Sequence, residues 1–209
     1  MVAVLSLLIA GSAGVTIWAD YRGPRLVVYC FKPLATGLIL VLALRPSTPR
    51  LPAYQYAVVA GLVCSLIGDV ILMLPKRKLL PGLVSFLAAH VSYIVAFSFG
   101  ARLSDCPLLL LPFLVFLVVV SVILLPHLGR MKVPVVGYEL VILLMAWRAL
   151  ERWLQMESVP AFAGFLGAIL FLFSDTLHAI REFVRKFRIA QALILSTYFC
   201  AQWLIALSV

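Results

Sequence analysis

Eight long apolar runs separated by short polar links constrain most strongly how this chain can fold. They cover residues 2–19, 27–44, 54–74, 81–100, 107–125, 133–150, 160–180 and 188–208. A helix needs about 20 apolar residues to cross the hydrocarbon core of a bilayer. With 65% hydrophobic residues and a mean hydropathy of +1.15, the chain also lies outside the range of soluble globular proteins. The sequence therefore predicts an all-α membrane protein, a bundle of eight transmembrane helices that forms one integral membrane domain over residues 1–209.

The formal net charge of +9 arises from Lys and Arg residues that gather in the short links. This pattern is typical of topology signals, so we expect no nucleic-acid partner. Eleven of the 17 Lys and Arg residues lie in the links after runs one, three, five and seven, and five lie on the opposite side. Because cytoplasmic links carry the excess of positive charge, both termini are predicted to face away from the cytoplasm. The first run lacks a preceding basic segment, which favours a membrane span over a cleaved signal peptide.

The chain has four cysteines, Cys30, Cys64, Cys106 and Cys200, and none of them forms a C-x-x-C pair. Three lie within apolar runs, and Cys106 lies at the edge of one. Free cysteines behave as small apolar residues and are usually buried. We therefore expect buried thiols and neither a disulfide nor a zinc site.

Two acidic residues interrupt apolar runs, and each follows a small residue: Asp69 follows Gly68, and Asp175 follows Ser174. An ionised carboxylate in hydrocarbon is costly unless it is paired or hydrated, so each aspartate indicates a functional site. The alternative is structural, a polar contact between helices with Ser, Tyr or Lys as the partner. We favour the functional interpretation because both acids are predicted at one depth in the membrane.

The predicted depth is similar for five polar side chains, since a helix rises about 1.5 Å per residue. Lys32, Asp69 and Asp175 each lie about five residues from the predicted cytoplasmic end of their run. Glu139 lies about six residues in, and His90 about nine. All five should therefore fall in the cytoplasmic half of the bilayer, where we expect the site.

The spacing of two tyrosines suggests an internal repeat. Tyr93 follows Asp69 by 24 residues and Tyr198 follows Asp175 by 23, each tyrosine lying in the next apolar run. A duplicated four-helix unit would explain this spacing. Because four is an even number of spans, the two halves would be parallel repeats about an axis along the membrane normal.

Six short fragments follow one another along the chain, from the second run to the last. They are Phe31-Lys32-Pro33-Leu34, Gly68-Asp69, Phe86-x-x-x-His90-x-x-Tyr93, Trp147-Arg148, Ser174-Asp175 and Thr197-Tyr198-Phe199-x-Ala201-Gln202. Together they resemble the YhhN-type lysoplasmalogenase family. The link Tyr21-Arg22-Gly23-Pro24 is similar to bacterial members, which implies a bacterial inner membrane. The resemblance implies a multi-spanning enzyme that hydrolyses the vinyl ether of lysoplasmalogens to a fatty aldehyde and glycerophosphoethanolamine or glycerophosphocholine. It implies a catalytic role for Asp69 and Asp175.

Five further residues form the candidate substrate-binding set. Lys32 is either a lysine that snorkels to the headgroups or a counter-ion or phosphate ligand. His90 is either a satisfied interior histidine or, as the resemblance implies, a group that binds the substrate or supports those that do. Tyr93 and Tyr198 are either walls of a pocket or ordinary helix packing. Gln202 joins the set through the last of the fragments.

The resemblance assigns no role to Glu139 or His178. Glu139 can pair with Lys32 or line a cavity, and we favour a structural role. Asp175 and His178 stand at i, i+3 spacing, which could suggest a metal site. Further ligands at matching spacing are missing from the sequence, so we expect no metal and interpret His178 as an interfacial residue near Arg181.

Vinyl ether cleavage begins with protonation of the β-carbon, after which water captures the oxocarbenium ion and the hemiacetal collapses. This chemistry needs one protonated acid and one carboxylate, which two nearby aspartates can supply without a metal or organic cofactor. The expected partners are membrane lipids and a lysoplasmalogen that enters from the bilayer; the sequence leaves the oligomeric state open. The competing hypothesis is a transporter or lipid-binding protein whose paired acids carry protons or bind a cation.

Overall fold

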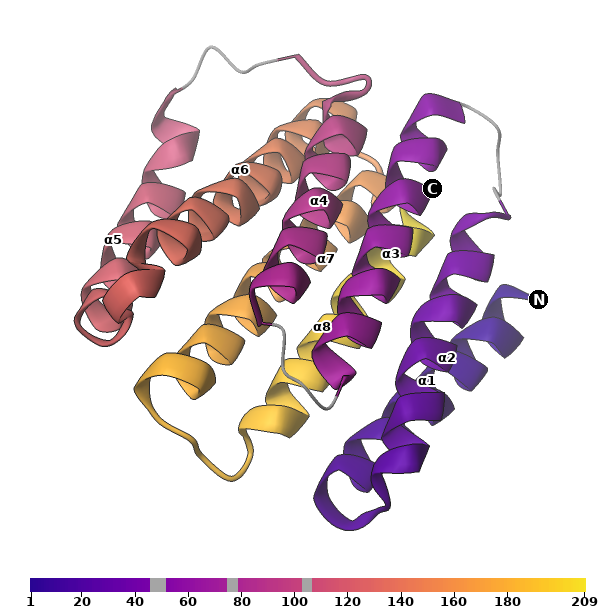
Figure 1. Cartoon of the computed structure of the whole chain (residues 1–209). Helices are drawn as coiled ribbons and strands as arrows, with labels where there is room; N and C mark the ends of the chain where they lie inside the picture. Colours follow the sequence, from indigo (N-terminus) through magenta and orange to yellow (C-terminus); the bar gives the residue numbers. More distant parts are fainter. Residues whose placement is uncertain (46–51, 75–78, 103–106) are drawn as a thin grey trace.

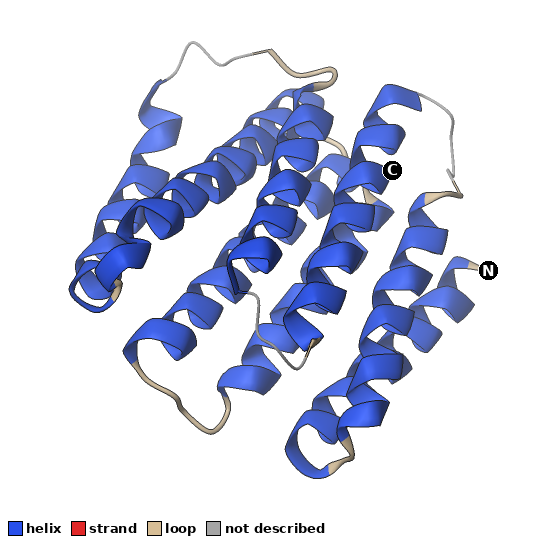
Figure 2. Cartoon of the chain, in the orientation of Figure 1, coloured by secondary structure: helices blue, strands red, loops and turns tan. Residues whose placement is uncertain are grey.

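The computed structural model describes residues 1–45, 52–74, 79–102 and 107–209, which form eight long helices and contain no strand (Figures 1 and 2). The helices are α1 (Val2–Arg22), α2 (Arg25–Ala43), α3 (Pro52–Met73), α4 (Leu79–Ser98), α5 (Leu111–Leu124), α6 (Lys132–Met156), α7 (Val159–Ala179) and α8 (Ala190–Leu207). Short 3₁₀ turns flank α5 and lead into α6, and a π turn (Ile180–Val184) follows α7. Counted with these turns, the eight helical segments are long and apolar enough to span a membrane, which confirms the predicted all-α bundle.

Successive helices run in opposite directions, so the links alternate between two ends of the bundle (Figure 1). The end that holds the α1–α2, α5–α6 and α7–α8 links is called the link end here. The other is called the terminal end, because both termini lie there. Trp203 of α8 donates a hydrogen bond from Nε1 to Oγ of Ser6 in α1 over 3.0 Å. The first and last helices are therefore neighbours.

Helix α6 is longer than the sequence predicts. The predicted run ends at residue 150 because Glu151 and Arg152 follow, yet α6 continues to Met156. Both side chains are buried, and Arg152 donates a hydrogen bond to the Phe99 carbonyl oxygen just after α4. The seventh run is also longer than predicted, since the π turn continues to Val184. Charged residues inside these helices were thus mistaken for helix ends.

Glycines allow close approach of the helices that carry the two aspartates. A Cβ atom at Gly61 of α3 would lie 2.3 Å from Cε1 of the Tyr93 ring on α4. A Cβ at Gly167 of α7 would lie 2.8 Å from the carbonyl oxygen of Ala201 on α8. Small residues at such contacts are common between membrane helices because they let backbones pack tightly. The α3–α4 and α7–α8 pairs thus form a firm frame for the site.

The outer surface of the bundle is apolar, which explains an error in the prediction for the cysteines. Cys30 and Cys200 are exposed and Cys64 is half-buried, so the prediction of buried thiols is wrong for the first two. Cys106 lies outside the described residues. A membrane helix is apolar on its lipid-facing side as well as on its packed side, so local sequence does not distinguish the two faces.

The two halves of the chain do not pack alike. Helix α1 runs along α2, whereas α5 diverges from α6 (Figure 1). The two tyrosines of the proposed repeat also have different partners: Tyr198 bonds to Asp69, and Tyr93 bonds to Gln202. The spacing of Asp and Tyr residues is therefore not matched by equivalent contacts.

Candidate active site

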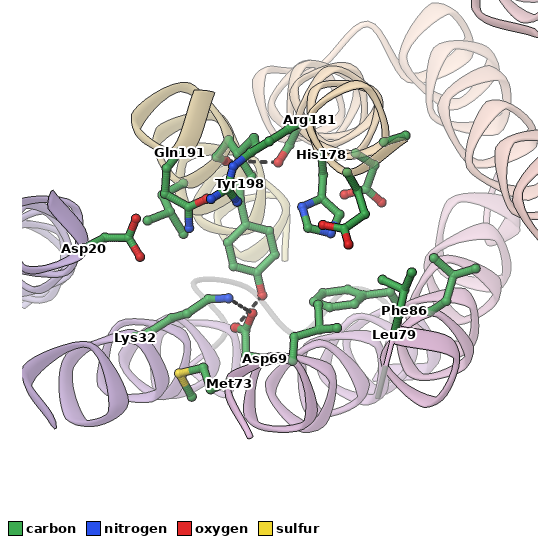
Figure 3. A pocket seen from close by; sticks show the side chains of 18 of the residues that line it. Asp20, Lys32, Asp69, Met73, Leu79, Phe86, His178, Arg181, Gln191 and Tyr198 are labelled. Atoms are coloured by element: carbon green, nitrogen blue, oxygen red, sulfur yellow. Dashed lines mark hydrogen bonds and ion pairs between the residues drawn. The ribbon is translucent and has the colours of Figure 1, made fainter. Parts of the chain in front are cut away.

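A cavity of about 690 Å³ opens at the link end of the bundle. Its wall includes residues from α1, α2, α3, α4, α6, α7 and α8 (Figure 3). Asp69 and Asp175, which are far apart in the sequence, both line it. Lys32, Glu139 and Tyr198 line it as well. Four of the five side chains that the depth argument grouped together therefore face one space.

Asp69 of α3 is almost fully enclosed, with 1% of its side chain exposed. Nζ of Lys32 lies 2.9 Å from Oδ1. The hydroxyl groups of Thr36 and Tyr198 both donate to Oδ2, over 2.9 Å and 2.7 Å. Lys32 and Thr36 lie one turn apart on α2, so both reach the same carboxyl group. A cation and two hydroxyl donors thus compensate a buried negative charge.

Asp175 of α7 is more open, with 20% of its side chain exposed. Its Oδ2 accepts a hydrogen bond from the Tyr138 hydroxyl and lies 3.1 Å from Nε2 of His90. The same His90 nitrogen lies 2.8 Å from the Tyr138 oxygen, so the three side chains form a triangle. The other carboxyl oxygen, Oδ1, has no hydrogen-bond partner among the described residues. Asp175 therefore has one oxygen fixed by the protein and one available to a ligand.

Aromatic packing connects the two carboxyl groups. The centroid of the Phe171 ring lies 4.7 Å from that of His90 and 5.5 Å from that of Tyr198, and the ring is edge-on to both. In the described part of the chain no hydrogen bond joins Asp69 to Asp175 directly. The two acids share a cavity, but each has its own set of partners.

Glu139 and His178, for which no role was assigned, both line the cavity. Lys32 pairs with Asp69 and not with Glu139, whose Oε1 is buried without a partner in the described residues. Nε2 of His178 is likewise buried and unpartnered there, and its ring points into the cavity (Figure 3). The interfacial interpretation of His178 therefore missed its place in the wall. No group of three or more His, Cys, Asp or Glu side chains within residues 1–45, 52–74, 79–102 and 107–209 could hold a metal ion.

Tyr93 and Gln202, both predicted for the site, bond to each other outside the cavity wall. The Tyr93 hydroxyl donates to Oε1 of Gln202 over 2.6 Å, and both side chains are fully buried. His90 is also fully buried, and it contacts Asp175 and Tyr138, which line the cavity. These three residues support the wall, and Lys32 and Tyr198 form part of it.

Two residues of the site were not predicted, Tyr138 and Thr36. Tyr138 immediately precedes Glu139, so it has the same predicted depth as the grouped residues, and that depth could have pointed to it. Thr36 follows Lys32 at i, i+4 spacing, which places both on one helix face. A search for hydroxyl side chains at the depth of the acids would have found both.

A second polar cluster lies at the terminal end, between α6 and the end of α4. The Arg148 guanidinium pairs with Glu151 and donates to Oγ of Ser98 over 3.2 Å and to the Ala101 carbonyl oxygen over 3.1 Å. Arg152 lies over the Tyr54 ring, 4.2 Å from its centroid. Cations close to a helix C-terminus are favourable because the last carbonyl groups are otherwise unpaired. This terminal cluster fastens the end of α4 to α6.

Comparison with known proteins gives consistent matches over most of the chain. A sequence model described as the YhhN family matches residues 27–209. "Uncharacterized membrane protein YhhN" of Escherichia coli is 32% identical over 197 residues, 94% of either chain. Human "Lysoplasmalogenase TMEM86B" is 34% identical over 161 residues, 74% of this chain and 64% of the human one. Bovine "Lysoplasmalogenase TMEM86A" is 34% identical over 189 residues, 84% of this chain and 70% of its own. No solved structure matches. The chain therefore belongs to the YhhN family.

Proposed function

We propose that this protein hydrolyses the vinyl ether bond of lysoplasmalogens, giving a fatty aldehyde and glycerophosphoethanolamine or glycerophosphocholine. The mammalian relatives that carry the name lysoplasmalogenase support this activity. The observation that carries the proposal is that Asp69 and Asp175 line one cavity in unlike surroundings. Acid-catalysed vinyl ether cleavage needs a proton donor, and a nearby carboxylate stabilises the cation that forms, as in the carboxyl pairs of glycosidases.

The cavity has two chemically different sides, as an amphipathic substrate requires. Leu79 and Leu83 of α4 and Ile142 of α6 contribute apolar side chains. Charged and polar groups come from α1, α2 and the region after α7. A single-chain lipid that enters from the bilayer can place its tail along the apolar side, with the reactive bond beside the acids.

The contacts of the two acids support different roles. Both oxygens of Asp69 are occupied, Oδ1 by Lys32 and Oδ2 by two hydroxyl groups. In the proposed mechanism Asp69 remains a carboxylate and faces the positive charge that develops on the substrate. Asp175 carries the proton on Oδ1, while its Oδ2 is held by Tyr138 and His90.

The proposed reaction balances with water as the only co-reactant. Asp175 Oδ1 gives its proton to the β-carbon of the vinyl ether, and the C=C electron pair forms the new C–H bond. The oxocarbenium ion that results is captured by water at the α-carbon, and the water's proton returns to Asp175. Transfer of the hemiacetal hydroxyl proton to the ether oxygen breaks the C–O bond. The aldehyde and the glycerol hydroxyl leave, and Asp175 is again protonated.

The test measures aldehyde release from lysoplasmalogen by the purified protein in proteoliposomes. Asp69→Asn and Asp175→Asn should each reduce release to background while keeping a helical, monodisperse protein. Glu157→Gln is the matched control, an acid-to-amide change at an exposed position outside the cavity, and should retain the wild-type rate. An active Asp175→Asn enzyme contradicts the mechanism. Proton-coupled lipid uptake without cleavage would support a transporter instead.

We also propose that the link end, and with it the cavity, faces the cytoplasm. The supporting observation is the excess of Lys and Arg in the links at that end. Two of the five cations counted on the opposite side, Arg148 and Arg152, are buried in α6, so they do not act as topology signals. In a cysteine-free background, an impermeant maleimide applied to spheroplasts should label Glu157→Cys and not Arg185→Cys. The reverse labelling would contradict this orientation.

A further inference from the structure

Two arginines line the polar side of the cavity without an ion-pair partner in the described part of the chain. Arg25 begins α2, and Arg181 lies in the π turn after α7. Lys32, which also lines the cavity, is already compensated by Asp69. A guanidinium group presents five N–H donors in a planar fork that matches the oxygens of a phosphate group. The two unpaired arginines are therefore suited to an anionic ligand.

The π turn places Arg181 in the wall. The Arg185 N–H donates to the carbonyl oxygen of Ile180 over 3.0 Å, five residues back. Figure 3 shows Arg181 extending over Tyr198 toward Gln191. Oε1 of Gln191 is buried and has no hydrogen-bond partner among the residues that the structure describes. A buried amide oxygen is an acceptor, so it indicates a hydrogen-bond donor of a ligand or a water at this position, while the arginines provide the donors for a phosphate.

We propose that Arg181 and Arg25 bind the phosphodiester of a lysophospholipid headgroup. The proposal rests on the proposed function for the identity of the lipid, and it names the part of the site that selects the headgroup. Arg181 follows Asp175 by six residues, a rise of about 9 Å along a helix. The phosphorus atom and the β-carbon of the vinyl ether are separated by seven bonds through the glycerol unit and its two flanking oxygens, a path of similar length when extended. A phosphate at Arg181 therefore leaves the ether beside Asp175.

The charges around the two arginines favour a phosphodiester over free phosphate. The carboxyl groups of Asp20 and Glu182 line the same cavity. Their repulsion is weaker for the single charge of a diester than for a phosphate dianion. The apolar side of the cavity also adds affinity for a ligand with a tail. The weaker repulsion and the added apolar contact both favour a lipid headgroup over free phosphate.

The binding experiment uses ligands that the enzyme is unable to cleave. A saturated 1-O-alkyl lysophospholipid, a 1-O-alkyl glycerol of the same chain length and inorganic phosphate are each titrated into the full-length protein in non-ionic detergent. Arg181→Gln should weaken lysophospholipid binding by about tenfold or more, because a charge-assisted hydrogen-bond pair is lost, and leave alkyl glycerol binding unchanged. Arg25→Gln should have a smaller effect in the same direction, since Arg25 is exposed.

Arg185→Gln is the matched control. Arg185 carries the same charge in the same link, is exposed and does not line the cavity, so both lipids should bind as to wild type. Equal effects of Arg181→Gln and Arg185→Gln, or equal losses for both lipids, would overturn the subsite. Arg181-dependent binding of inorganic phosphate without discrimination between the lipids would also overturn it.

The outcome separates this proposal from the proposed function. Arg181-dependent binding of the lysophospholipid, with no aldehyde from lysoplasmalogen, would support the subsite and contradict the hydrolase. Aldehyde release at equal kcat/KM from lysoplasmalogen and from 1-O-alkenyl glycerol would support the hydrolase and contradict the subsite.

Discussion

The cavity at the link end and the terminal cluster both bury charged side chains, but they satisfy them differently. In the terminal cluster Arg148 and Arg152 donate to carbonyl oxygens at the end of α4, and Arg148 also pairs with Glu151. Buried atoms without a hydrogen-bond partner in the described residues occur in both places, at Nε of Arg152 and at Glu139 and His178, but only Glu139 and His178 line the cavity. Buried charge alone therefore does not distinguish a functional site from a structural one. Polar groups that line a cavity and have no protein partner indicate a functional site.

The comparison is sharpened because the same two helices contribute to both places. Helix α4 carries His90 near Asp175 and Ser98 at the terminal cluster. Helix α6 carries Tyr138 near Asp175 and Arg148 at the terminal cluster. Substitutions in one helix should therefore affect turnover at one end and stability at the other.

The largest expected effect is a loss of stability at the terminal cluster. Arg148→Met removes the cation that pairs with the fully buried Glu151, and breaking such a pair typically costs about 3–5 kcal/mol. Unfolding midpoints in detergent should fall sharply, while turnover per folded molecule stays at the wild-type value. The double variant Arg148→Met, Glu151→Leu should recover much of the loss. Normal stability with lost turnover would contradict the structural role of the terminal cluster.

Tyr138→Phe changes the cavity end of the bundle, where it should reduce turnover and leave stability nearly unchanged. It removes the hydroxyl that donates to Oδ2 of Asp175, and a hydrogen bond to this acid in its neutral, protonated form contributes about 0.5–1.5 kcal/mol. We expect kcat to fall by about tenfold or more with KM for the lipid unchanged, because Tyr138 positions the acid. The unfolding midpoint should change little. An equal loss of stability and of activity would indicate that Tyr138 is only a packing residue.

Tyr54→Phe is the same change in the terminal cluster. The Tyr54 hydroxyl lies 2.5 Å from Oγ of Ser208, so its removal should cost about 1 kcal/mol of stability. Turnover should be unaffected, and the phenylalanine ring still packs under Arg152. Aldehyde release and thermal unfolding, measured beside Tyr138→Phe, complete the matched pair. A turnover defect in Tyr54→Phe would mean that the two ends are coupled.

The smallest effect is expected on the outer surface. Cys200 of α8 is exposed and belongs to neither polar cluster. Cys200→Ala should change the unfolding free energy by less than about 0.5 kcal/mol and leave turnover unchanged. This variant gives the baseline against which the other three are compared, and a larger change would indicate a contact on this face.

The eight helices could be predicted because crossing a membrane depends on local apolar length. The grouping of Lys32, Asp69 and Asp175 could be predicted in depth, since depth follows from residue number along a helix. Which side chains meet could not be predicted, because that depends on how each helix is rotated. Lys32 was as compatible with Glu139 as with Asp69 until the helices were placed.

Two further residues show the same limit. A tyrosine in an apolar run costs little to bury, so only its depth beside Glu139 could have pointed to Tyr138, which contacts Asp175. The fragment Trp147-Arg148 belongs to the family resemblance, yet Arg148 lies at the terminal cluster. Resemblance indicates that a position is shared with a family, and it does not indicate whether that position serves the site or the frame around it.

The π turn at Ile180–Val184 separates two tasks along one helix. Successive residues of an α-helix point about 100° apart around its axis, yet Arg181, Glu182 and Phe183 all line the cavity. Deleting Ile180 would move Arg181 back by one position and rotate it away, while Asp175, upstream of the deletion, would keep its direction. The direction in which Arg181 points is thus set separately from the direction of Asp175. In the proposed function, a deletion of one residue at Ile180 would therefore change headgroup binding and leave the acid in place.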